Sequence, residues 1–240
     1  MQQKTIEYAH GKEKLIGELF FNEEISGKQP AVILFHAFEG RAEFTLDYAK
    51  KLRAQGFVVL VADMYGEAKV AHSIDECFKL VTPFLQDRQL VRTRALLAYE
   101  TIRQQPQIDN SRISAIGFCF GGMCVLELAR SGADLWAGVS MHGVLAKSDL
   151  PTRAIKSKLL ILHGYKDPQV PPIELGHFAE EMEAAGTKDW IFTFFGHARH
   201  SFTDPKTGTF DPEKEQAMGR QYHQLAAERS FKYAVGFLQE

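Results

Sequence analysis

The sequence predicts an α/β fold with a mostly parallel central sheet, an N-terminal antiparallel hairpin and helices on both faces. Short apolar runs alternate with longer segments of helical period, as in a parallel sheet that helices cover. Several of these runs are apolar at every position, which is typical of strands buried on both faces. Ahead of the first run, two short segments flank "HGKEK" and indicate a hairpin that extends the edge of the sheet.

The expected strands follow in chain order. The hairpin consists of residues 4–10 and 14–21, and the later strands are residues 31–35, 57–63, 113–118, 136–142, 158–164 and 191–195. Between them, apolar residues recur every three or four positions, which predicts amphipathic helices over residues 44–52, 91–102 and 175–185. A further helix is expected over residues 120–130, directly after Cys119. Residues 203–215 read as a loop, and a closing helix is expected over residues 213–238. With no repeat or linker, residues 1–240 are expected to form one domain.

Composition excludes several classes of function. The 28 basic and 30 acidic residues give a net charge of −2, so nucleic acid and anionic membranes are not expected partners, and a small molecule fits better. Three cysteines make a disulfide framework improbable, and no Cys/His cluster has the spacing of a metal site. No apolar run has the roughly 20 residues that span a bilayer. A cytoplasmic, soluble protein is expected; the oligomeric state is left open.

One segment, "IGFCFGG", places a cysteine at a strand-to-helix turn. Cys119 follows the strand at 113–118, and Gly117 and Gly121 stand two residues to either side. A nucleophile held at a strained backbone angle needs such neighbours without a Cβ atom. The first turn of the helix would also place backbone N–H groups near the sulfur, where they favour a thiolate and later an oxyanion. A lone cysteine is more often a buried structural thiol, but this setting favours a nucleophile.

Two further residues match the order expected for a nucleophile, an acid and a histidine at successive strand ends. Asp167 lies three residues past "LLILHG", and His200 follows "IFTFF". As an alternative, His197 could be the base in place of His200. Structural roles are expected for the strand-end residues His142 and His163, and a loop-binding role for the strand-end carboxylate Asp63.

The chain resembles the dienelactone hydrolase family of α/β hydrolases in "ILFHAFEGR", "LVADMYGEA", "IGFCFGG", "ILHGYKDPQVPP" and "HSFTDP". The resemblance implies a cysteine triad of Cys119, Asp167 and His200, which cleaves lactones or small esters through an acyl-thioenzyme without a cofactor or metal. It also implies an oxyanion hole made by the backbone N–H groups of Phe38 and Phe120.

The sequence departs from the family pattern in two places. The family's first-loop glutamate, implicated in priming the thiol, aligns with Ala37, so Glu39 either takes over that role or merely lies in the loop. The family's substrate-binding arginine, four residues after the histidine, is replaced by Asp204, which makes an anionic substrate doubtful. The arginines that could compensate are Arg88, Arg92 and Arg199.

The predicted function is therefore hydrolysis of small carboxylic esters or lactones by a cysteine nucleophile. The alternative is a non-catalytic binding or thiol-sensing module on the same scaffold, because a fold does not determine a function. A nucleotide-binding role is not favoured, because the G-x-G-x-x-G and Walker patterns are both absent. The aromatic residues near the motifs indicate either an apolar pocket or ordinary core packing.

Overall fold

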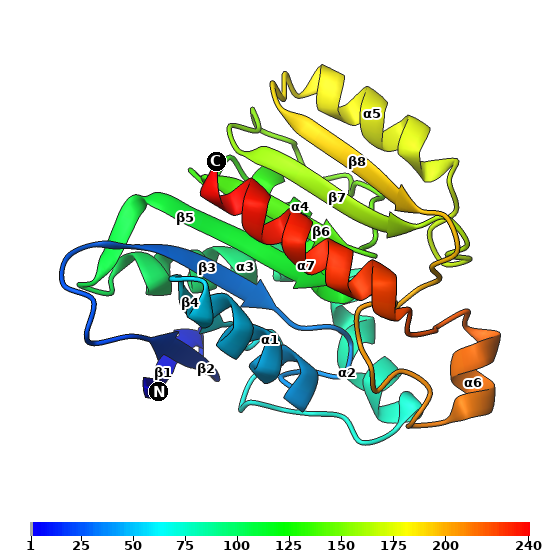
Figure 1. Ribbon diagram of the computed structural model, residues 1–240, viewed down its shortest axis with the longest axis horizontal. Coiled ribbons are helices and arrows are strands. Elements are labelled where there is room, and N and C mark those ends of the chain that lie inside the picture. The colour runs from blue at the N-terminus through cyan, green and yellow to red at the C-terminus, as the bar shows by residue number, and fades with distance from the viewer. Residues whose placement is uncertain (1) are drawn as a thin grey trace.

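The computed structural model describes residues 2–240, and its centre is an eight-stranded sheet in the order β1-β2-β4-β3-β5-β6-β7-β8 (Figure 1). The strands are β1 Gln2–His10, β2 Glu13–Phe21, β3 Gln29–Phe35, β4 Val58–Val61, β5 Ile108–Phe118, β6 Ala137–Met141, β7 Lys158–Gly164 and β8 Trp190–Phe195. From β4 to β8 all neighbours run parallel, so the carboxyl ends of these strands meet at one edge. This arrangement confirms the predicted fold class.

The N-terminal hairpin lies at the sheet edge, as predicted. His10 pairs with Glu13, and Gly11 in the turn between them has φ of +60°, a conformation that glycine adopts at little cost. β2 then runs antiparallel to β4 and joins the hairpin to the parallel strands.

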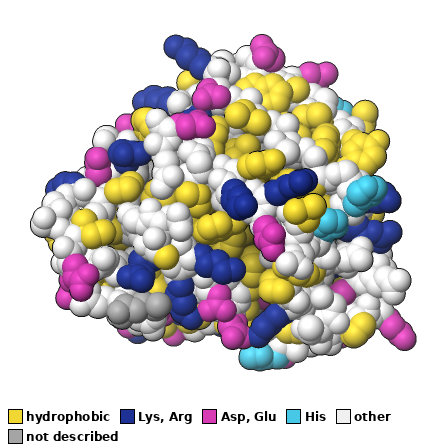
Figure 2. Space-filling view, in the orientation of Figure 1, with side chains coloured by type: hydrophobic (Ala, Val, Ile, Leu, Met, Phe, Trp, Pro, Cys, Tyr) yellow, Lys and Arg dark blue, Asp and Glu magenta, His cyan; other side chains and the backbone are white. Residues whose placement is uncertain are grey.

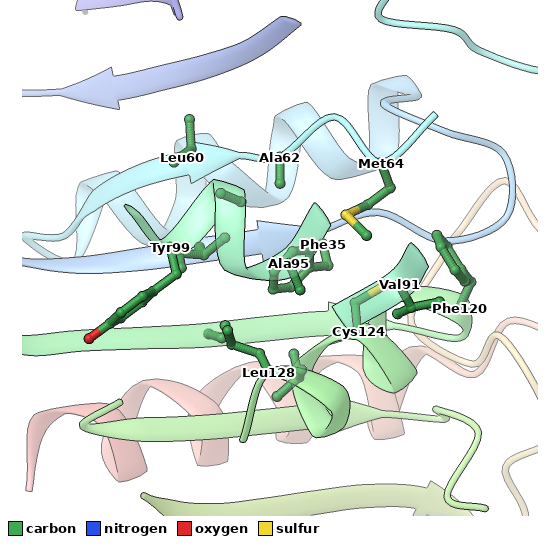
Figure 3. Packing of buried hydrophobic residues seen from close by; sticks show 14 of the residues in the cluster. Phe35, Leu60, Ala62, Met64, Val91, Ala95, Tyr99, Phe120, Cys124 and Leu128 are labelled. Carbon is green, nitrogen blue, oxygen red and sulfur yellow. The ribbon is translucent and has the colours of Figure 1, made fainter. Parts of the chain in front are cut away.

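Helices cover both faces of the sheet because side chains alternate along each strand. In β3, Ile33 and Phe35 pack in one apolar cluster, whereas Val32 and Leu34 pack in the cluster on the opposite face. The first face carries α2 Ile74–Gln86, α3 Arg88–Arg103, α4 Phe120–Arg130 and α5 Glu174–Ala184, and the second carries α1 Glu43–Ala54 and α7 Gln224–Gln239 (Figures 1 and 3).

The helices differ from the predicted ones at two places. The expected closing helix over 213–238 is two helices, α6 Pro212–Ala217 and α7, because Gly219 has φ of +72° and the backbone of residues 219–221 bonds to His200 instead. The sequence analysis also missed α2, although Ser73 caps its N-terminus and its buried residues recur at helical spacing. None of the helices in residues 2–240 combines the length and apolarity that crossing a lipid bilayer requires.

Candidate active site

Cys119 occupies the turn between β5 and α4 with φ of 51° and ψ of −114°. A positive φ is unusual for a residue with a side chain, and such strain gathers at functional sites. The cysteine is 9% exposed, so it lies below the surface at the edge where the parallel strands end.

The glycines of the motif let this turn pack tightly. A Cβ atom on Gly117 would lie 2.0 Å from the carbonyl oxygen of Gly121, and one on Gly121 would lie 2.2 Å from the carbonyl oxygen of Phe35. Gly122 allows a similar approach, because a Cβ atom there would lie 2.5 Å from Ser140 Oγ. The turn therefore needs glycine at these positions, because the backbone atoms approach too closely for a Cβ atom. The sequence analysis predicted this need for Gly117 and Gly121, the residues on either side of Cys119.

Gly121→Ala is expected to lower the free energy of unfolding by about 1–3 kcal/mol, because backbone atoms at the end of β3 cannot move away easily. Urea unfolding followed by circular dichroism measures this loss. The control is Gly236→Ala in α7, where nothing lies within 4 Å of the added Cβ and stability should rise by about 0.5–1 kcal/mol. Equal stabilities of the two variants would contradict the close approach at Gly121.

The structure brings together the three residues that the sequence placed at separate strand ends. His200 Nε2 lies 3.0 Å from Cys119 Sγ, and His200 Nδ1 lies 2.8 Å from Asp167 Oδ2. Asp167 Oδ1 accepts hydrogen bonds from the backbone N–H groups of Gln169 at 2.9 Å and Val170 at 3.3 Å. A thiol, an imidazole and a carboxylate thus form one hydrogen-bonded chain at the carboxyl edge of β5, β7 and β8.

Electrostatics favour a cationic imidazole in this chain. Burial opposes the charge on His200, but the negative charge of Cys119 and the bonds to Asp167 and Cys119 raise its pKa to about 10. Burial likewise opposes ionisation of Asp167, yet the adjacent imidazoles of His163 and His200 bring its pKa below the usual value. The arrangement therefore favours the cationic form of His200 between the sulfur and the carboxylate.

A second histidine, His142, lies between the backbone of Cys119 and the side chain of Thr203. The backbone N–H of Cys119 donates to the carbonyl of Met141 at 3.0 Å and also lies 3.2 Å from His142 Nδ1, while His142 Nε2 lies 2.8 Å from Thr203 Oγ1. Burial and the neighbouring charge of His200 lower the pKa of His142 well below its usual value. His142 therefore faces the site as a neutral hydrogen-bonding residue.

The two expected oxyanion donors are the backbone N–H groups of Phe38 and Phe120, and hydrogen bonds hold the loop that contains Phe38. The carbonyl of Phe38 accepts from Tyr65 Oη at 3.0 Å, and the carbonyl of Ala37 accepts from His36 Nδ1 at 2.7 Å. Within residues 2–240, the backbone N–H groups of Phe38 and Phe120 donate no hydrogen bond, so both are available to a ligand. The Phe120 side chain is 1% exposed and packs in the core, which favours the core-packing interpretation of that aromatic residue (Figure 3).

Glu39 contacts an arginine that the sequence analysis missed. Its carboxylate pairs with Arg220, which also lies 3.2 Å from Glu215 Oε1 and stands over the ring of Phe38 at 4.3 Å from its centroid. Burial opposes the charge of Arg220, but Glu39 and Cys119 raise its pKa. Nothing in the sequence singled out Arg220, because it follows His200 by twenty residues inside the expected closing helix. A role of Glu39 in priming the thiol stays a prediction.

The remaining candidates lie elsewhere or have other partners. His197 is exposed, and Asp63 accepts bonds from four backbone N–H groups of neighbouring loops and β2, which supports the loop-binding interpretation. Arg199 is exposed, and Arg88 and Arg92 both pair with Glu127 of α4. Cys77 and Cys124 are fully buried in the apolar cluster beneath α2, α3 and α4; Figure 3 shows the latter.

Three cavities lie beside the segment that follows His200, and Asp204 lines two of them. A hollow of about 790 Å³ between α1 and α7 has Phe44, Tyr48 and Phe231 among its lining residues, and Figure 2 shows yellow apolar side chains within it and dark blue basic side chains around it. A smaller cavity of about 60 Å³ shares Phe44 and Asp204 with the first and is also lined by Glu39 and Arg220. In the part of the chain that the structure describes, no cluster of His, Cys, Asp or Glu has the geometry of a metal site.

Comparisons with known proteins identify a family and several similar chains. A model of the dienelactone hydrolase family matches residues 17–240. The solved structure of a dienelactone hydrolase-like promiscuous phosphotriesterase from metagenomic libraries has 33% identity and a TM-score of 0.92, covering 99% of this chain and 97% of its own.

The relatives that are similar in sequence include two proteins with lactone-related names. A protein named "Probable 2-oxo-3-(5-oxofuran-2-ylidene)propanoate lactonase" from Bradyrhizobium sp is 26% identical over 80% of this chain and 81% of its own length. A carboxymethylenebutenolidase homolog from Xenopus tropicalis is 25% identical over 87% of this chain and 85% of its own length.

Proposed function

This chain belongs to the dienelactone hydrolase family, and we propose that it hydrolyses small neutral esters or lactones through a Cys119–His200–Asp167 triad. Hydrolysis of a carboxylic ester or lactone is the activity that the family and its relatives support. The observation that carries the finer proposal is the continuous chain from Cys119 Sγ through the His200 ring to Asp167 Oδ2. Three side chains from three strand ends meet with the geometry that an activated thiol needs.

Acylation begins at the sulfur. His200 holds the proton of Cys119, and the thiolate attacks the carbonyl carbon to form a C–S bond while the carbonyl electrons move to oxygen. The N–H groups of Phe38 and Phe120 stabilise that oxyanion, and one such donor contributes about 3 kcal/mol to lowering the barrier. The C–O bond to the leaving group then breaks, and His200 Nε2–H protonates the departing alkoxide.

Deacylation reverses the role of the imidazole. His200, now neutral, takes a proton from water, and the resulting hydroxide attacks the thioester carbonyl. The carbon–sulfur bond breaks, the carboxylic acid leaves, and the thiolate and the imidazolium are restored together. Asp167 accepts from Nδ1–H throughout, which keeps Nε2 directed at the sulfur and stabilises the positive ring.

The charges beside the triad support a neutral substrate. The guanidinium of Arg220 is paired with both Glu39 and Glu215, so its charge is already neutralised. Asp204, which lines the same small cavity as these groups, adds a further carboxyl. A substrate carboxylate placed there would meet excess negative charge, whereas an uncharged ester would not.

The test compares a neutral chromogenic ester with an otherwise similar ester that carries a carboxylate. Burial and the charge of Glu39 raise the pKa of Asp204 to about 6, so this group gains its negative charge as the pH rises through that value. The preference of the wild type for the neutral ester, as a ratio of kcat/KM, should therefore grow severalfold between about pH 5 and pH 7. In Asp204→Asn the ratio should be smaller and independent of pH.

The matched control is Asp211→Asn, which removes another carboxylate of the same segment, at the N-terminus of α6. It should leave the ratio as in the wild type. A wild type that turns over neither a neutral ester nor a neutral lactone would contradict the proposed function. If Asp204→Asn showed the same pH-dependent preference for the neutral ester as the wild type, the role of Asp204 in substrate choice would be wrong, but the proposed hydrolysis would stand.

A neutral phosphotriester is a second candidate substrate. The structural relative with 33% identity is named a promiscuous phosphotriesterase, and it aligns over nearly the whole of both chains. An uncharged triester would also be compatible with the charges around Arg220. Including one triester among the assayed substrates tests this activity.

The alternative of a non-catalytic binding or thiol-sensing module has less support. Membership of a hydrolase family and the hydrogen-bonded triad both favour an enzyme. We also propose that the whole chain acts as one domain, because all eight strands join in a single sheet.

A further inference from the structure

A second imidazole lies against the carboxylate of Asp167. His163 is on β7, four residues before Asp167, and its Nε2 lies 3.3 Å from Asp167 Oδ2. The side chain is 1% exposed, and neither of its ring nitrogens makes a well-aligned hydrogen bond within residues 2–240. The sequence analysis favoured a satisfied structural histidine here, and the structure instead has a histidine that lacks partners.

An apolar residue would be the ordinary choice at this position. Leu159 and Ile161 precede His163 on the same face of β7 and are buried in an apolar cluster. The His163 ring packs beside Phe192 and Phe194 of β8, with centroids 6.0 and 6.3 Å away. A buried polar group without partners destabilises a protein, so its presence among apolar neighbours calls for a specific reason.

The hydrogen bonds of Asp167 supply that reason. Two backbone N–H groups donate to Oδ1 and His200 donates to Oδ2, so three donors hold the carboxylate and Oδ2 can accept one more. His163 Nε2 stands at that place. Catalytic hydrogen bonds are commonly long or poorly aligned in a free enzyme and shorten when substrate binds.

We propose that His163 is a positioning residue whose Nε2–H donates to Asp167 Oδ2 and holds that oxygen in line with His200 Nδ1. The inference rests on the proposed function, since it assigns His163 to the same triad. In this role His163 donates through Nε2–H, transfers no proton and does not touch the substrate. Without its bond, Asp167 is held on the Oδ2 side by His200 alone, and the imidazole is less well directed at the sulfur.

The first test asks whether His163 acts as a hydrogen-bond donor or only fills space in the core. His163→Leu keeps an apolar side chain but removes the donor, and we expect kcat for a neutral ester to fall about tenfold with KM changed less than about twofold. His163→Gln can place an N–H near the position of Nε2, and it should keep kcat within about threefold of the wild type. Phe194→Leu is the packing control, because it disturbs the surroundings of the ring and leaves the donor; its kcat should stay near the wild type.

The second test asks whether the effect passes through Asp167. In an Asp167→Asn background, His163→Leu should cause no further loss of kcat, because the carboxylate that His163 positions is already absent. A purely structural role would reduce kcat by the same factor in both backgrounds. Equal losses in the two backgrounds, or equal activities of the Leu and Gln variants, would overturn the proposal.

A third measurement works without a substrate ester. The rate at which iodoacetamide alkylates Cys119, followed by intact mass, reports the ion pair of sulfur and imidazole. It should fall severalfold in His163→Leu and recover in His163→Gln. If it does so in a chain that cleaves no ester, the role of His163 stands and the proposed hydrolysis fails; if it is unchanged while esters are cleaved, the role of His163 fails alone.

Discussion

Replacing Cys119 with alanine is expected to reduce kcat for a neutral ester by at least about a thousandfold. The reason is that the acyl group has no atom to bond to once the sulfur is gone, while His200 and the oxyanion donors remain. Cys119→Ser keeps a nucleophile in the same place but exchanges the sulfur for a less acidic hydroxyl, so it should retain only a small part of the activity.

The chain itself offers the controls for this experiment. Cys77 and Cys124 are fully buried in the apolar core, so Cys77→Ala and Cys124→Ala should keep kcat near that of the wild type. Intact mass after a brief reaction with ester should show one added acyl group, mapped by peptide digestion to Cys119. Full turnover in Cys119→Ala, or an acyl group on another residue, would rule out this cysteine as the nucleophile.

Asp167→Asn is expected to lower kcat by about a hundredfold or more. Asp167 Oδ1 accepts from two backbone N–H groups, so the amide oxygen of asparagine takes that place and its NH₂ group faces His200. A donor there forces His200 Nδ1 to accept, which moves the ring proton to Nε2 and prevents the imidazole from removing the proton of Cys119. The ion pair of sulfur and imidazole is lost with it.

Two readouts check this result. The kcat for the neutral ester should fall, and the rate of Cys119 alkylation at neutral pH should fall with it, because less sulfur is ionised. Asp189→Asn is the control, because that exposed carboxylate precedes β8 at the opposite end of the strand from His200. Alkylation and turnover both within about twofold of the wild type would show that Asp167 does not set the state of His200.

The closing segment shows where sequence reasoning was incomplete. Apolar spacing predicted one helix over residues 213–238. The helix is interrupted around Gly219, and Arg220 lies outside both α6 and α7, where it pairs with Glu39. Periodicity reports only which residues share a face of a continuous helix. It contains no information about a backbone bridge to His200, which lies about twenty residues earlier in the chain.

The site was predictable to the extent that its residues follow strands. Cys119, Asp167 and His200 each come shortly after a run that reads as a buried parallel strand, and parallel strands end at one edge. Their positions along the chain therefore predicted that the three side chains lie close together at that edge. The partners of Glu39, His142 and His163 were not predictable in the same way, because they depend on which direction a side chain takes in the packed core.

The eight strands, the tight turn at Cys119 and the chain order of the three residues of the proposed triad can all be predicted from the amino-acid sequence. These features depend on local patterns, namely apolar periodicity and glycines beside a cysteine. The folded chain, in contrast, is needed to see that Arg220 pairs with Glu39 across 181 positions, and that His163 lies beside Asp167 with no other polar partner within residues 2–240. Hydrogen bonds and ion pairs act over a few ångströms, and folding brings such distant side chains within that range.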